Sequence, residues 1–112
     1  MDLNKFDVYK ILNDELTKDY VIFLNYLIDG VENNEFNQLK FEDKLTYNVI
    51  NIPNFVKATS EIVITSDNML RKAKVLETKG YIKIKMGKFN DSKCGYTRTA
   101  IAINKKAYDL LR

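Results

Sequence analysis

Apolar residues recur at helical spacing in the first half of the chain. Five of them occupy positions i, i+3, i+4, i+7 and i+8, the pattern of one buried helix face: Tyr20, Phe23, Leu24, Leu27 and Ile28. Thr17 precedes this stripe as a candidate N-cap, and Gly30 follows it as a candidate stop. A shorter helix, through about Asn13, is predicted ahead of it from a less regular pattern.

The pattern changes to alternation between residues 31 and 51. Leu39 and Phe41 alternate with polar neighbours, and so do Leu45, Tyr47 and Val49. Strict alternation is typical of half-buried strands, so a small hairpin around residues 42–44 is expected. An irregular segment with one short strand is the alternative.

A second helical region follows. Asn51 before Pro53 predicts a short helix through Ser60, because proline is tolerated in a first helical turn. Residues 62–64 are apolar and predict a buried turn. The next helix begins at Thr65 or Ser66, and it ends at a glycine suited to the left-handed conformation. Four of its residues share one face: Met69, Ala73, Leu76 and Gly80.

The last third of the chain alternates again. Residues 81–86 and 96–103 have the period of two paired strands, with a polar, basic loop from Gly87 to Gly95 between them. Asn104 is placed to cap a final helix, whose inward residues are Ala107, Leu110 and Leu111.

Length and composition fit one domain over residues 1–112. With 46% hydrophobic residues in 112, the chain can form a core without metals or disulfides. Cys94 is the only cysteine, so no disulfide within the chain is expected. The sequence shows no signal peptide and no apolar run of membrane-spanning length, which leads us to expect a cytoplasmic protein without membrane contact.

The residue types also limit the chemistry. The chain has no histidine, so the commonest general base and metal ligand is missing. No glycine lies in a nucleotide-binding motif. We therefore expect no catalytic residues, no metal site and no cofactor, and a function other than catalysis.

Charge is divided unevenly. Residues 1–56 hold ten acidic and five basic residues, whereas residues 57–112 hold five acidic and thirteen basic ones. The segment from Lys83 to Arg98 has a net charge of +4. A basic hairpin beside a basic helix is typical of duplex binding, since cations pair with phosphates. A charged helix alone would equally fit an ordinary solvated surface.

The helix 66–79 and the hairpin supply the candidate contacts. Arg71 suits guanine and Asn68 suits adenine, while the lysines suit phosphates. The predicted DNA-binding residues are Ser66, Asn68, Arg71, Lys72, Lys74, Lys85, Lys88, Asn90, Lys93 and Arg98.

Residues 65–82 resemble the recognition helix of bacterial winged-helix regulators, and residues 91–111 look like the wing return and next helix of the MarR and PadR families. The resemblance covers about residues 51–112. It implies an α+β winged helix-turn-helix fold, mainly helical, with a two- or three-stranded antiparallel wing. The helix-turn-helix would span about 51–79, the wing about 81–103 and a C-terminal helix about 104–112.

The same resemblance implies a transcriptional regulator that binds double-stranded DNA as a homodimer. Ala107 stands where those families usually have glycine, and the chain ends at Arg112, where MarR-type proteins continue into dimerisation helices. The dimer expected here would thus use other helices. Two alternatives remain: a replication-initiation module of a phage or plasmid, and a protein-interaction module that uses the acidic N-terminal half.

Overall fold

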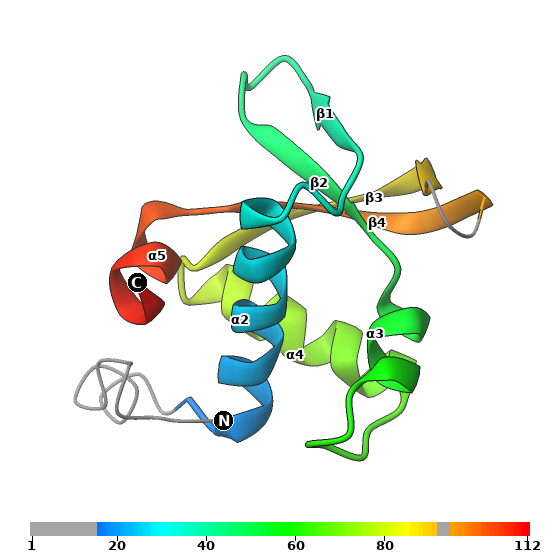
Figure 1. Cartoon of the computed structure of the whole chain (residues 1–112). Coiled ribbons are helices and arrows are strands. Elements are labelled where there is room, and N and C mark those ends of the chain that lie inside the picture. The colour runs from blue at the N-terminus through cyan, green and yellow to red at the C-terminus, as the bar shows by residue number, and fades with distance from the viewer. Residues whose placement is uncertain (1–15, 92–94) are drawn as a thin grey trace.

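The computed structural model describes residues 16–91 and 95–112 (Figure 1). The helix predicted through about Asn13 lies outside the described residues. Lys93 and Cys94 lie outside them as well. No helix in the described part is long and apolar enough to cross a membrane. The elements are α2 (Lys18–Glu32), β1 (Gln38–Lys40), β2 (Thr46–Ile50), α3 (Ile52–Ala58), α4 (Ser66–Thr78), β3 (Ile82–Asp91), β4 (Gly95–Ile103) and α5 (Lys105–Leu111).

The strands form one antiparallel sheet in the order β1-β2-β4-β3. The β1–β2 hairpin, expected from alternation, joins the β3–β4 hairpin because β2 pairs with β4, with Val49 opposite Ala100. The α+β class is thereby confirmed. The β3–β4 hairpin has two strands, and the β1–β2 hairpin extends it to one sheet of four.

The helices cover one face of this sheet, below it in Figure 1. Ile50, Ile82 and Ile101 face them from three strands, and residues of α2, α3, α4 and α5 complete a single core cluster. Phe23 of α2 has no exposed surface and meets Phe55 of α3 edge to face, with ring centroids 5.1 Å apart. The predicted stripe on α2 and its counterpart on α4 are therefore the inner faces of these helices.

Gly30 does not end α2, contrary to the sequence prediction. The helix continues to Glu32, and Gly30 is buried within it. A Cβ at this position would overlap the ring of Phe36. The glycine is needed for this close approach rather than for a turn.

The ends of α4 follow the sequence prediction. At its start, the Thr65 hydroxyl accepts a hydrogen bond from the backbone N–H of Asn68 at 3.2 Å. At its end, Gly80 has φ of +88°, and the amide of Tyr81 bonds back to the Leu76 carbonyl. The segment between α3 and α4 is different: Val63, predicted to be buried, is fully exposed at 105% relative area.

The β3–β4 hairpin is longer than predicted. Most of the expected loop from Gly87 to Gly95 is strand, since β3 continues to Asp91. Pairing shifts between Met86 and Phe89, which marks a bulge. On the other side of β3, the amide of Ile84 donates to a carboxylate oxygen of Glu77 on α4, at 2.6 Å.

The sheet face opposite the helices has its own small cluster. Tyr47, Ala100 and Ala102 are buried there, with the partly buried Phe41 and Phe89 packed against them. The hydroxyl of Tyr47 donates to Asp43 at 2.7 Å, which closes the β1–β2 turn over the cluster.

This cluster gives a pH prediction. Burial and the bond to Asp43 raise the pKa of Tyr47 to about 12, against about 10 in an unfolded chain. A raised folded pKa means that the contribution of Tyr47 to stability is complete below about pH 10 and disappears between about pH 10 and 12. We expect phenolate absorbance to show a late ionisation step that Tyr47→Phe lacks.

The same bond lowers the pKa of Asp43 below its ordinary value. Tyr47→Phe should consequently raise the pKa of Asp43, measured by NMR titration of its side chain. An Asp43 titration identical in both proteins would contradict the bond.

Candidate functional site

The exposed face of α4 lies opposite its buried stripe. Asn68, Arg71 and Lys74 are all exposed there, and within the described residues neither Arg71 nor Lys74 has an acidic partner. Ser66, at the first position of the helix, is partly buried. Two cations on one exposed helix face, without intramolecular partners in the described structure, are available to bind an anion.

Lys72 lies on the flank of α4 that faces α2. Its ammonium is 3.5 Å from the Asp19 carboxylate and 4.7 Å from the centre of the Tyr20 ring. Only 28% of its side chain is exposed. Lys72 therefore joins α4 to α2 through these contacts. It does not belong to the exposed face of α4 that holds Arg71 and Lys74.

The hairpin contributes a second pair of cations. Lys88 on β3 and Arg98 on β4 are exposed and have no ion pair with any described residue. The Lys88 ammonium lies 4.5 Å from the ring centre of Tyr96, which is itself 65% exposed. Asn90 is exposed too, and its carbonyl accepts a hydrogen bond from Asn37.

Two other hairpin lysines are engaged on the far face of the sheet. The ammonium of Lys85 lies 4.6 Å from the centre of the Phe41 ring. Lys83 pairs with Asp43 at 3.5 Å. Of the predicted residues, Lys85 is thus placed on the side of the sheet away from the helices.

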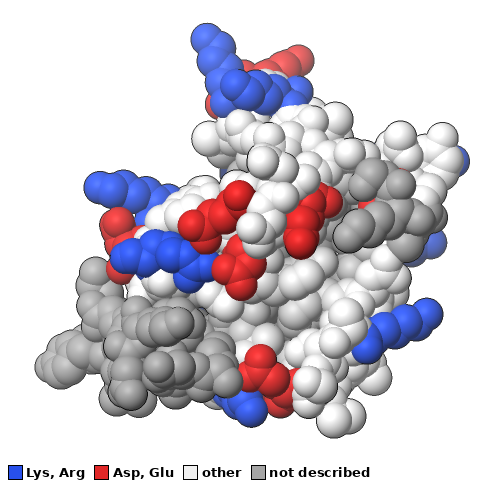
Figure 2. Space-filling model, viewed as in Figure 1, with Lys and Arg blue, Asp and Glu red and all other residues white. Residues whose placement is uncertain are grey.

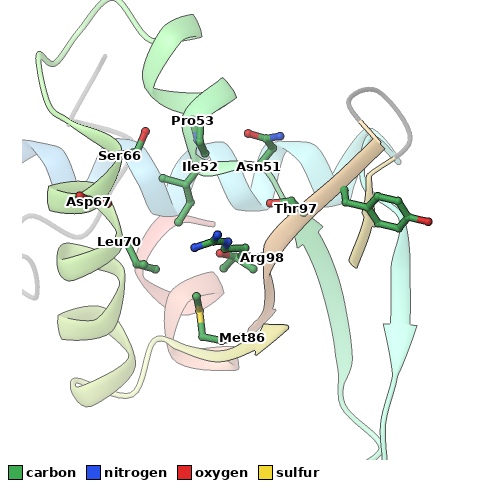
Figure 3. A pocket seen from close by; sticks show the side chains of 11 residues that line it. Asn51, Ile52, Pro53, Ser66, Asp67, Leu70, Met86, Thr97 and Arg98 are labelled. Atoms are coloured by element: carbon green, nitrogen blue, oxygen red, sulfur yellow. The ribbon is translucent and has the colours of Figure 1, made fainter. Parts of the chain in front are cut away.

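A groove runs between the start of α4 and the hairpin (Figure 3). Its volume is about 380 Å³. Figure 3 shows Arg98 extending from β4 into this space, between Ile52 and Met86. Its lining comes from three parts of the chain: Asn51, Ile52 and Pro53; Ser66, Asp67 and Leu70; and Met86 and residues 96–99.

The groove brings together Ser66 and Arg98 among the predicted residues. Sequence reasoning did not assign Met86 or Asp67 to this groove. Met86 is 51% exposed although it continues the apolar side of β3. One sequence signal for this role was available: Met86 is apolar and lies just before a glycine in a basic hairpin.

Acidic residues gather elsewhere. Figure 2 shows them over the middle of the face where α2 lies in Figure 1. Asp29 and Glu32 of α2 pair there with Arg112, at 2.5 and 2.8 Å. The described residues include no cluster of acidic, histidine or cysteine side chains able to hold a metal ion.

Comparison with known proteins adds no relative: no protein-family model matches the chain, and neither a curated protein nor a solved structure gives a significant match.

Proposed function

We propose that this chain is a winged helix-turn-helix protein that binds double-stranded DNA, with α4 in the major groove and the β3–β4 hairpin on the backbone or in the minor groove. The observation that supports this most directly is the set of four exposed cations on these two elements. Arg71, Lys74, Lys88 and Arg98 are without acidic partners among the described residues. Phosphates are the anions that such a set matches over a long, regular surface.

The order of elements supports the winged-helix proposal. A helix (α2) and a strand (β2) precede two successive helices (α3 and α4), which the β3–β4 hairpin follows. β2, which lies between α2 and α3 in the sequence, pairs with β4, the second strand of the hairpin. This arrangement holds α4 beside the hairpin and leaves its outer face open, as insertion into a groove about 12 Å wide requires.

Within this proposal the residues have different roles. Arg71 and Asn68 are the candidates for base edges, because a guanidinium and an amide can each form two hydrogen bonds to one base. Lys74, Lys88 and Arg98 are assigned to phosphates. Lys72 and Lys85 act through the packing of α2 and of the aromatic cluster instead.

The salt dependence of binding tests the proposal. The three cations assigned to phosphates predict a slope of roughly −3 for log K against log salt concentration. Lys88→Ala should weaken binding to all sequences alike and reduce the slope by about one. Fluorescence anisotropy on mixed-sequence duplexes measures both quantities. A slope near zero, or no binding at low salt, contradicts DNA binding.

A regulator that works as a homodimer should select a symmetric site. Selection from a random DNA pool is then expected to yield a palindrome with half-sites about one helical turn apart. An asymmetric selected site argues instead for a monomer or for the replication role.

A protein-interaction module is the second candidate, and the segment between α3 and α4 favours it. Val63 is fully exposed there, with Ile62 and Ile64 partly exposed beside it. Apolar side chains on a loop are typical of protein contacts. A partner whose binding survives charge reversal at Arg71 and Lys88 but not Val63→Asp would establish this role.

A further inference from the structure

The groove beside α4 differs in character from the cationic surface around it. Four apolar side chains line it: Ile52, Pro53, Leu70 and Met86. Among the described residues of its lining, Arg98 is the one cation and Asp67 the one acidic residue. A phosphate would meet one favourable and one unfavourable charge next to apolar surface, which makes a backbone phosphate a poor occupant.

A flat heteroaromatic ring suits this lining better. Its faces are apolar and its edge has donors and acceptors, so Met86 can contact a face while the Asp67 carboxylate accepts from an amino group, as acidic side chains do from cytosine. Arg98 adds a guanidinium, whose plane can stack on an unpaired base while its N–H groups bind a neighbouring phosphate. The volume of about 380 Å³ is at the small end of ligand sites, which fits one ring system.

The position of the groove indicates where such a ring would come from. It opens between α4 and the hairpin, the two elements whose cations would hold the duplex. A base on a strand already held there is at a high effective concentration, whereas a free nucleotide is not. Extruding a base from an intact duplex costs a few kcal/mol, so a base that is already unpaired is the favoured occupant.

We propose that the groove lined by Ile52, Leu70, Met86 and Arg98 binds one unpaired nucleobase adjacent to the duplex. The inference rests on the DNA-binding function proposed above. It makes the preferred DNA a junction between paired and unpaired strands, such as a duplex end with a single-stranded tail, rather than continuous duplex.

Two labelled DNA hairpins with identical stems test this, one blunt and one with a short single-stranded tail, with both tail polarities tried. The full chain should bind one tailed hairpin about tenfold more tightly than the blunt one, the effect of a stacked base. Met86→Ala should remove most of that preference without changing affinity for the blunt hairpin. Leu45→Ala is the control, because Leu45 is similarly apolar and exposed but lies outside this groove.

Each outcome distinguishes the two proposals. Equal affinity for blunt and tailed hairpins overturns the nucleobase site and leaves duplex binding intact, whereas no binding to either overturns DNA binding itself. A preference for tails that persists in both Met86→Ala and Asp67→Asn places the tail elsewhere and also overturns the site. The site is also overturned if a free deoxynucleotide changes the NMR signal of the Met86 methyl group while the protein shows no preference for tailed hairpins. Circular dichroism checks that each variant folds.

Discussion

Reversing two charges on the exposed face of α4 is expected to lower affinity for duplex DNA by about a hundredfold or more. In Arg71→Glu with Lys74→Glu, two contacts are lost, and two carboxylates are placed against phosphates. Loss of a base-reading arginine alone costs about 1–3 kcal/mol, and loss of a phosphate contact adds to it. Both residues are exposed and without acidic partners among the described residues, so folding should change little.

The matched control reverses the same number of charges elsewhere. Lys40 and Lys44 belong to the β1–β2 hairpin, at the opposite edge of the sheet from β3, and both are exposed. Lys40→Glu with Lys44→Glu changes the net charge equally, so it measures the long-range electrostatic effect alone. Anisotropy at one salt concentration measures the affinity of both double variants for duplex DNA. Equal losses of affinity would show that α4 is not part of the interface.

Truncating the centre of the core should have the largest effect on stability. Phe23→Ala removes a ring with no exposed surface, packed against Phe55 and Tyr26. Phenylalanine-to-alanine changes in cores cost about 3–5 kcal/mol, a large share of the roughly 5–15 kcal/mol that stabilises a typical domain. We expect Tm to fall by more than about 10 °C.

Tyr96→Ala is the appropriate comparison, because it truncates an aromatic ring that is 65% exposed. Its change in stability should stay within about 0.5 kcal/mol. Urea unfolding followed by circular dichroism measures both variants. If Phe23→Ala is no less stable than Tyr96→Ala, α2 does not pack in the core as described.

Local chemistry made several elements predictable. The stripe from Tyr20 to Ile28 has a helical period because one side of α2 is buried. The ends of α4 were predictable because Thr65 and Gly80 satisfy backbone groups within a few residues of themselves. Such signals depend only on neighbours in the sequence.

Other features depend on distant parts of the chain. The role of Lys72 is set by Asp19 and Tyr20, which approach it only in the folded protein. The hairpin was predicted too short because Lys88 and Asn90 are polar, yet both strands are held by backbone pairing and are exposed at these positions. The groove is assembled from three separated segments, so no local pattern could indicate it.

The hydrogen bond from the Ile84 amide to Glu77 bears on how the protein behaves at high concentration. β3 is an edge strand, and the outward backbone groups of such strands can pair with other copies and seed aggregation. The Glu77 carboxylate accepts a hydrogen bond from one of those backbone amides. The bulge after Met86 also interrupts the regular spacing that a second strand would need. The exposed edge is thereby a poor template for intermolecular β-pairing.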